Sequence, residues 1–220
     1  MTSRRYLLLS ILLGIVVIAV FASRRGVSSP AAKQSGKVTI EKLPVSVAVH
    51  TFDPAAPPAD MPPLAAGEEA ECDSNFTSNV NVKGQPEKHD ATHAVVTVTE
   101  VKMTLQLAIN VWVPEAATQH VIEHEQGHRQ IAERYYQTAD KVGEQIAAKF
   151  LGKEVPVSGA DLKAEAGKLL EQMSAEITAE YNVALNADRA QRRYDDITDH
   201  SRNDVSADDA VAQALQDGQQ

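Results

Sequence analysis

Residues 119–136 read QHVIEHEQGHRQIAERYY, and this stretch carries the clearest chemical signal in the chain. At its centre, His124, Glu125 and His128 form the pattern H-E-x-x-H. Because residues four apart lie one turn apart on the same face of an α-helix, the two imidazoles can bind one zinc ion. Glu125 then lies beside them, where its carboxylate can activate a water molecule. The stretch therefore predicts a zinc site on a helix.

The residues around the motif repeat with the period of a helix. Apolar and histidine side chains recur at spacings of three, four and seven, which places both motif histidines on the face that packs inward. Gly127, inside the motif, leaves room for another segment to approach. His120 lies eight residues before His128, about 12 Å along the axis, so we expect it to be solvated in the first turn. The inward positions are Val121, His124, His128, Ile131, Tyr135, Val142 and Ile146.

Residues 1–25 form a separate segment. Arg4 and Arg5 precede an uninterrupted apolar run, Tyr6–Ala22, which is followed by a short basic stretch. In helical form the run spans about 26 Å, the short end of what crosses a bilayer. The segment predicts either a cleaved export signal or an uncleaved anchor in the inner membrane. In both cases we expect the rest of the chain to be periplasmic or secreted, joined to this segment by a linker at residues 26–36.

The remainder of the chain is strongly acidic. Without residues 1–25 it has 17 basic and 30 acidic residues, a net charge of −13. Such a charge repels nucleic acid and anionic lipid headgroups, so membrane contact is expected only through the N-terminal segment. The single cysteine, Cys72, excludes an internal disulfide bond.

Two regions before the motif have strand patterns. Lys37–Thr51 alternates weakly and predicts one or two short strands, and Phe52–Ala70 is rich in proline and alanine and predicts a loop. Thr92–Val113 alternates strongly, but the apolar positions change from even to odd numbers near Glu100–Lys102. That change predicts a turn or a β-bulge between two strands. An edge strand next to the motif helix would also suit an extended peptide substrate.

The second half of the chain is predicted to be helical. The motif helix should end near Gly152, and a second long helix should follow from about Ala160 to Arg193. The short connection between them implies an antiparallel pair, and Ser206–Leu215 predicts a final short helix. The predicted fold class for residues 37–220 is therefore α+β, with a small antiparallel sheet packed on two long antiparallel helices.

A catalytic zinc ion usually has three protein ligands, so the motif needs a partner. If the two long helices are antiparallel, Asp188 lies near the level of the motif, on the inward stripe of the second helix. His200 lies in the segment that leaves this helix, from which a few residues can bring it back to the metal. The sequence pattern leaves Asp188 and His200 as alternatives.

Two motifs together resemble a known family. The H-E-Q-G-H of residues 124–128 follows a β region ending in Trp-Val-Pro, and residues 194–200 read Tyr-Asp-x-x-Thr-x-His. In these motifs the chain resembles a bacterial family of predicted secreted zinc-dependent proteases, catalogued as a domain of unknown function. The similarity covers roughly Lys37–Asp204. It implies that Tyr194, Asp195 and Thr198 belong to the active site and that His200 is the third ligand. Ser201 is a departure, because the family tends to have Gly there.

The combined expectation is an exported, zincin-like metallopeptidase acting on peptide or protein substrates. His124, His128 and His200 would hold Zn²⁺, and Glu125 would activate a zinc-bound water to hydrolyse peptide bonds. Tyr194 would donate a hydrogen bond to the oxyanion, and Asp195 would orient a ligating imidazole. One alternative is a non-catalytic zinc-binding envelope protein. Another is a helical interaction module in which the histidines are core residues without a metal.

Overall fold

The computed structural model of the protein describes residues 36–64 and 67–218. The described residues belong to one compact unit. The predicted export signal or anchor lies outside the described residues. Among the helices within the described ranges, none combines the length and the apolar character of a membrane span.

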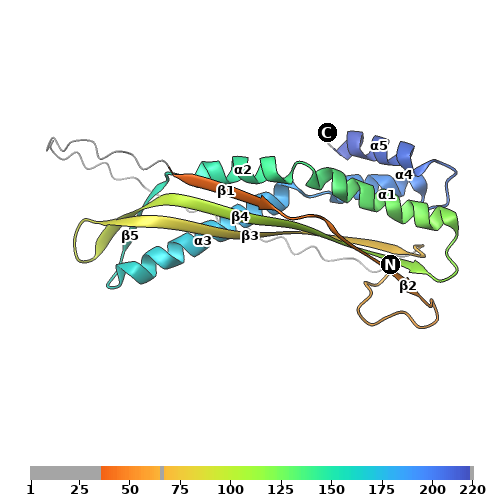
Figure 1. Ribbon diagram of the computed structural model, residues 1–220, viewed down its shortest axis with the longest axis horizontal. Coiled ribbons are helices and arrows are strands. Elements are labelled where there is room, and N and C mark those ends of the chain that lie inside the picture. Colours follow the sequence, from red (N-terminus) through yellow and green to blue (C-terminus); the bar gives the residue numbers. More distant parts are fainter. Residues whose placement is uncertain (1–35, 65–66, 219–220) are drawn as a thin grey trace, which may run out of the picture. The chain divides into compact units, whose positions relative to one another are not determined.

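The sheet is organised around strand β4 (His93–Pro114), and each of the four other described strands pairs with it. β1 (Lys37–Lys42) and β2 (Ser46–Phe52) run parallel to β4, one after the other. β3 (Glu71–Lys88) and β5 (Glu154–Ser158) run antiparallel to it. The result is a five-stranded mixed sheet in this part of the chain, with β4 at its centre (Figure 1).

The prediction of an antiparallel sheet is therefore wrong for β1 and β2. The sequence predicted one or two short strands in this region but did not predict β3, whose inward positions include the small or polar Cys72, Ser74 and Ser78. With β3 in place, the chain reverses twice between β2 and β4, once through the proline-rich loop and once at residues 89–92. Two reversals restore the original direction, so β2 and β4 are parallel.

Strand β4 contains a β-bulge at Thr99. Lys83 of β3 pairs with Glu100, and Gly84 pairs with Val98, so Thr99 has no opposite residue. The extra residue lets even-numbered side chains before it and odd-numbered ones after it point to the same face. Of the predicted turn or bulge, the bulge is confirmed, but the two predicted strands are wrong because the bulge lies within one long strand.

Both predicted long helices are interrupted. The first is two helices, α1 (Gln119–Tyr136) and α2 (Ala139–Phe150). The second is α3 (Leu162–Ala184) and α4 (Asp188–Thr198). The predicted final helix is confirmed as α5 (Ala207–Gly218).

Local polar side chains explain the second interruption. The Asn186 side chain accepts a hydrogen bond from the backbone N–H of Asp188 at 2.7 Å, which stabilises a turn and starts a new helix. Because α4 is separate from α3, it can change direction and pack against α1 and α5. The estimate that placed Asp188 near the motif assumed one continuous helix and is wrong for this reason.

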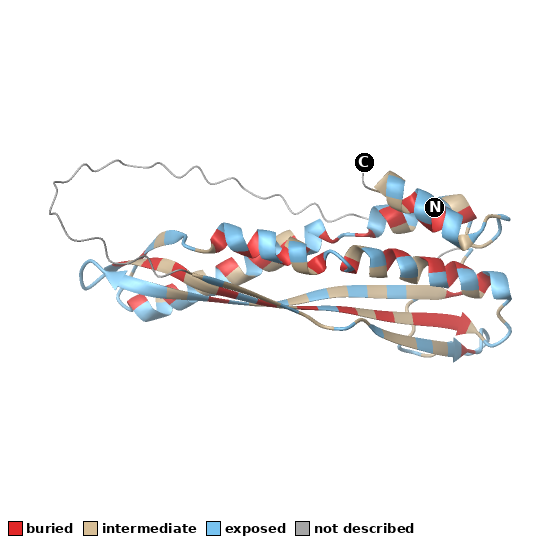
Figure 2. Cartoon of the chain, turned by 45° about the horizontal axis from the view of Figure 1, so that its top comes forward, coloured by how far each residue is buried: buried red, intermediate tan, exposed pale blue. Residues whose placement is uncertain are grey.

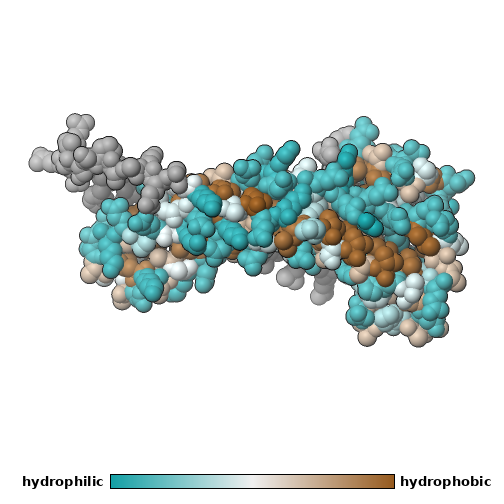
Figure 3. Space-filling model, in the orientation of Figure 1, coloured by the Kyte–Doolittle hydropathy of each residue, from teal (hydrophilic) through white to brown (hydrophobic). Residues whose placement is uncertain are grey.

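Helices α1, α2 and α3 pack on one face of the sheet, and α4 and α5 pack against α1. Buried residues lie along the helix faces turned toward the strands, as Figure 2 shows. The other sheet face carries exposed polar side chains on β3, among them Asn75, Thr77, Asn79 and Asn81. In the space-filling view, hydrophilic residues cover most of the visible surface (Figure 3). The buried side chains of β4 are Ala94, Val96, Val98, Val101, Met103, Leu105, Leu107, Ile109, Val111, Trp112 and Val113.

Deleting Thr99 should strongly destabilise the fold. Without the bulge, either Val96 and Val98 or the odd-numbered residues after them must turn toward water. Exposing these two valines alone would lower the free energy of unfolding by about 3–6 kcal/mol. Urea unfolding measures the change. Thr99→Ala is the matched control and should change stability by less than about 1 kcal/mol, since it removes only a 3.4 Å contact to Lys83 O. Equal effects of both changes would contradict a register fixed by the bulge.

Candidate metal centre

The H-E-x-x-H motif lies on α1, as predicted. The helix begins after Thr118, whose side chain accepts a hydrogen bond from the backbone N–H of Val121 at 3.3 Å. His124 and Glu125 are 6% and 4% exposed. A buried carboxyl group beside a buried imidazole is unfavourable unless both have polar partners or a cation. The motif therefore needs such partners inside the protein.

Helix α4 and the loop after it supply them. Asp195 Oδ1 lies 2.8 Å from His128 Nε2 and 3.6 Å from His124 Nε2. The two Nε2 atoms are 3.2 Å apart. His200 Nδ1 lies 3.9 Å from Asp195 Oδ1. His124, Asp195 and His200 each offer one ligand atom, and these three atoms lie within 4.8 Å of one another. The three residues, called the metal group below, could therefore hold a metal ion.

The donor atoms fit a metal ion in two respects. Tetrahedral ligands at about 2.0–2.1 Å from zinc lie roughly 3.3 Å from one another, and the observed separations of 2.8–3.9 Å bracket this value. Asp195 Oδ1 and His200 Nδ1 are also buried without a hydrogen-bond partner of good geometry. Unpartnered buried atoms of this kind are rare in native proteins, and a shared cation satisfies them.

Gln191 fixes the tautomer of His128. Its Oε1 atom accepts a hydrogen bond from His128 Nδ1 at 2.7 Å, and its Nε2 donates to the His128 backbone carbonyl at 3.1 Å. Since Oε1 can only accept, Nδ1 carries the proton and Nε2 directs its lone pair toward Asp195. A lone pair facing a carboxylate at 2.8 Å requires a proton or a metal ion between them. Gln191 was not predicted from the sequence. The one pattern that could have indicated it is its position four residues before Asp195, on the same face of α4.

Gly127 allows α4 to approach α1. A Cβ atom at this position would collide with the hydroxyl group of Tyr194. The Tyr194 ring stacks on the His124 ring, with centroids 5.1 Å apart, and meets the His128 ring edge-on at 4.9 Å. The predicted approach of another segment at Gly127 is confirmed, and that segment is α4.

The loop after α4 presents His200 in an unusual backbone conformation. Asp199, His200 and Ser201 have φ angles of 46°, 52° and 66°, three consecutive non-glycine residues in the left-handed region. Each such residue is disfavoured by roughly 1–2 kcal/mol. Just before this turn, the Thr198 hydroxyl group donates a hydrogen bond to the carbonyl oxygen of Tyr194 at 2.8 Å, at the C-terminal end of α4. The strained turn directs His200 back toward Asp195.

A cleft of about 160 Å³ opens beside the motif. The start of β3 forms one wall with Glu71, Cys72 and Ser74, and α1 contributes Glu125 to the other. Burial, with nearby carboxylates, raises the pKa of Glu71 to about 7 and that of Glu125 to about 8. Burial and the neighbouring Glu125 also raise the pKa of the Cys72 thiol, which keeps it protonated. The cleft therefore concentrates acidic groups that favour a cation.

The pKa values of the two motif histidines shift in opposite directions. Burial and the neighbouring His128 lower the pKa of His124 to about 4. Burial also acts to lower the pKa of His128, but the Asp195 carboxylate outweighs it and raises this pKa to about 9. His124 is therefore ready to donate a lone pair, whereas His128 exchanges a proton for any metal ion it binds.

Most of the predicted site residues come together. His124, Glu125, His128, Asp195 and His200 converge on one buried region. Asp188, the alternative third ligand, is exposed at the start of α4 and lies outside this group. His120 is exposed in the first turn of α1, as predicted.

Two predicted residues occupy places that sequence did not foresee. Asp195 was expected behind a ligating imidazole, yet its carboxylate lies in front of the Nε2 atoms at ligand distance. Tyr194 was expected to face the substrate. It is fully buried, and its hydroxyl group lies against Gly127 and forms no hydrogen bond with any described residue.

Comparison of the chain with protein-family models, with curated proteins and with solved structures found no match. The resemblance of the two motifs to the predicted protease family therefore remains a prediction.

Removing the Gln191 side chain should weaken metal binding. In Gln191→Ala, His128 loses the partner that fixes its tautomer and ring orientation, which typically lowers metal affinity by about 10–100-fold. Competition for Zn²⁺ with a chromogenic chelator measures this change. Gln130→Ala, at an exposed position of the same α1 helix, serves as the control and should keep wild-type affinity. Wild-type affinity in Gln191→Ala would show that the His128 tautomer is fixed elsewhere.

Glycine at position 201 should stabilise the protein. Ser201 has φ 66°, and Ser201→Gly removes a left-handed strain of roughly 1 kcal/mol, less the entropy that glycine adds to the unfolded chain. We expect the urea midpoint to rise in Ser201→Gly and to stay unchanged in Ser201→Ala, which keeps the Cβ atom. A lower midpoint for the glycine variant would mean that the Ser201 side chain itself holds the turn.

Proposed function

We propose that the protein is a zinc-dependent endopeptidase that acts outside the cytoplasm. The observation that carries the proposal is the buried Glu125 carboxyl group, which shares one cleft with His124, His128 and Asp195, while His200 approaches Asp195 from the loop after α4. The resemblance of the two motifs to a predicted protease family adds support, as does the export-type segment at residues 1–25.

Zinc is the metal that best suits these donors. Imidazole nitrogen and carboxylate oxygen are common zinc ligands, whereas calcium and magnesium prefer oxygen alone. His124, His128 and His200 would hold the ion, with Asp195 as a further ligand or as their hydrogen-bond partner. When bound, zinc lowers the pKa of a coordinated water molecule and polarises a carbonyl group.

Glu125 would move the protons. Its carboxyl group faces the cleft from α1, and its pKa of about 8 lies in the range that suits proton transfer near neutral pH. Glu125 would take a proton from the attacking water and pass it to the departing amine nitrogen. A bound cation would favour its carboxylate form and so prepare it to accept that proton.

Strand β3 offers a place for the substrate backbone. In the described structure β3 forms its ladder with β4, and the start of β3 lines the cleft. An extended peptide can pair with the free edge of such a strand. Its carbonyl group would then pass in front of the metal group.

The buried position of Tyr194 supports a positioning role. Its ring lies against both motif imidazoles, and burial together with the nearby Glu125 raises the pKa of its hydroxyl group. Tyr194 would keep the two rings in place. This role replaces the oxyanion contact expected from the resemblance.

A non-catalytic zinc-binding envelope protein is the second candidate. The specific observation in its favour is Asp195 Oδ1, which lies 2.8 Å and 3.6 Å from the two Nε2 atoms. Three histidines and this carboxylate could fill all four positions of a closed, structural zinc site. Glu125 has no task in such a site.

Glu125→Gln separates the two candidates. The change keeps size and polarity but removes the proton acceptor, so we expect unchanged zinc content and a loss of peptide cleavage of at least about 100-fold. Metal analysis and mass spectrometry of a digested peptide mixture give the two readouts. Glu123→Gln, at an exposed position of α1, is the control and should cleave like the wild type.

Two results would contradict the peptidase proposal. One is cleavage by Glu125→Gln at the wild-type rate. The other is a zinc-loaded wild type that cuts none of the peptides, which would favour the structural site.

A further inference from the structure

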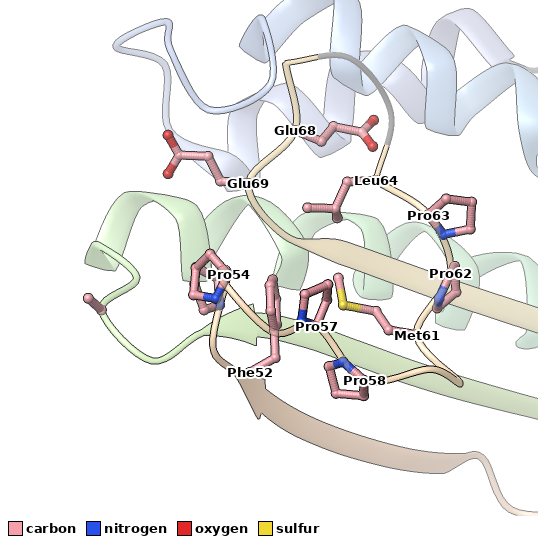
Figure 4. Close-up of a pocket in the computed structure, with 12 residues that line it drawn as sticks. Phe52, Pro54, Pro57, Pro58, Met61, Pro62, Pro63, Leu64, Glu68 and Glu69 are labelled. Carbon is pink, nitrogen blue, oxygen red and sulfur yellow. The ribbon is translucent and has the colours of Figure 1, made fainter.

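A second cavity, of about 620 Å³, lies at the end of strands β2 and β4. The loop at residues 52–64 supplies most of its wall, and Pro114 and Ala116, just before α1, complete it. Figure 4 shows Pro57 between Phe52 and Met61 in this wall. The volume falls within the range of about 300–1,000 Å³ that is typical of ligand sites.

Prolines and local hydrogen bonds restrain the wall of the cavity. Six of its twelve lining residues are prolines, each of which fixes its own φ angle. Local hydrogen bonds hold the loop between them. Asp53 accepts from the backbone N–H groups of Ala55 and Ala56 at 2.9 Å, and Met61 N–H donates to Pro58 O at 3.2 Å. A preformed apolar cavity binds without the entropic penalty of ordering a loop.

The cavity adjoins the metal group through Glu68. This residue lines both the cavity and the cleft that contains Glu125. Its Oε1 atom lies 3.5 Å from His200 Nδ1. A chain that lies in the cleft and continues past Glu68 therefore enters the cavity.

We propose that this cavity receives a large apolar side chain of an extended polypeptide substrate. The proposal rests on the proposed peptidase function, and it names the substrate class. Alternate side chains of an extended peptide point the same way, so one of them enters the cavity while the backbone follows β3. The apolar wall selects leucine, methionine or phenylalanine, and the carboxylates of Glu68 and Glu69 at the rim reject acidic side chains.

Binding to an inactive enzyme tests the proposal without cleavage. The probes are two capped alanine pentapeptides that carry either phenylalanine or glutamate at the centre. Calorimetry with full-length, zinc-loaded Glu125→Gln should show the phenylalanine peptide binding at least about 10-fold more tightly. Equal affinities would overturn the proposal.

Variants in the cavity locate the preference. Met61→Arg fills the cavity with a charged side chain and should remove the difference between the two peptides. Leu64→Arg, at a 36% exposed position of the same wall, gives an independent test should Met61→Arg unfold the loop. Val183→Arg, at a 78% exposed position of α3, is the control and should keep the preference. A preference that survives both loop variants would contradict the cavity as its source.

Other results separate this inference from the proposed function. Suppose that the phenylalanine peptide binds more tightly in a Met61-dependent way, but the wild type cuts no peptide. This result would support the cavity as a side-chain site and contradict the peptidase function. Cleavage without any residue preference near the cut would support the peptidase function and contradict the cavity as a side-chain site. Decanoate that binds in a Met61-dependent way, while neither peptide binds, would make the cavity a lipid site and overturn the proposal.

Discussion

The contact between Tyr194 and Gly127 decides whether the metal group exists. Helix α4 can lie close enough to α1 only because residue 127 has no Cβ atom. That closeness lets Gln191 reach His128 and Asp195 reach both motif imidazoles, and it places the turn that carries His200. A larger side chain at position 127 would push the two helices apart and separate one half of the site from the other.

The helix that carries the motif could be predicted from sequence because the pattern depends on spacing within one helix. H-E-x-x-H needs only the helical period, and Val121, His124 and Ile131 of the predicted inward face are buried, whereas Tyr136 is buried in place of the predicted Tyr135. The partner residues were harder to predict, because their position depends on how α4 turns away from α3. An Asn186 side chain bonded to one backbone N–H determines that turn, and no periodic pattern reports it. The sequence pattern left His200 and Asp188 as alternatives and the family resemblance favoured His200, whereas Gln191 left no usable pattern.

The sheet was predicted less well, for a related reason. β4 alternates apolar and polar side chains over most of its length, so its pattern is strong. β3 has a polar open face and partly polar inward positions, and its strand character comes from pairing with β4 rather than from its own residues. Because β3 was not predicted, the predicted path of the chain had one reversal too few. The predicted directions of β1 and β2 relative to β4 were therefore wrong. Propensity alone could not correct this, because strand pairing is a tertiary interaction.

The central place of β4 has a consequence for how the domain folds. β1 pairs with a segment of β4 about sixty residues further along the chain, and β2 does likewise. Loops of this length must close before any of these pairings forms, which slows folding. During synthesis from the N-terminus, β1, β2 and β3 emerge before their described partner strand. Each therefore stays unpaired until its matching residues of β4 have appeared, which for β2 means residues 108–114, and over that interval the acidity of the chain helps it to remain dispersed.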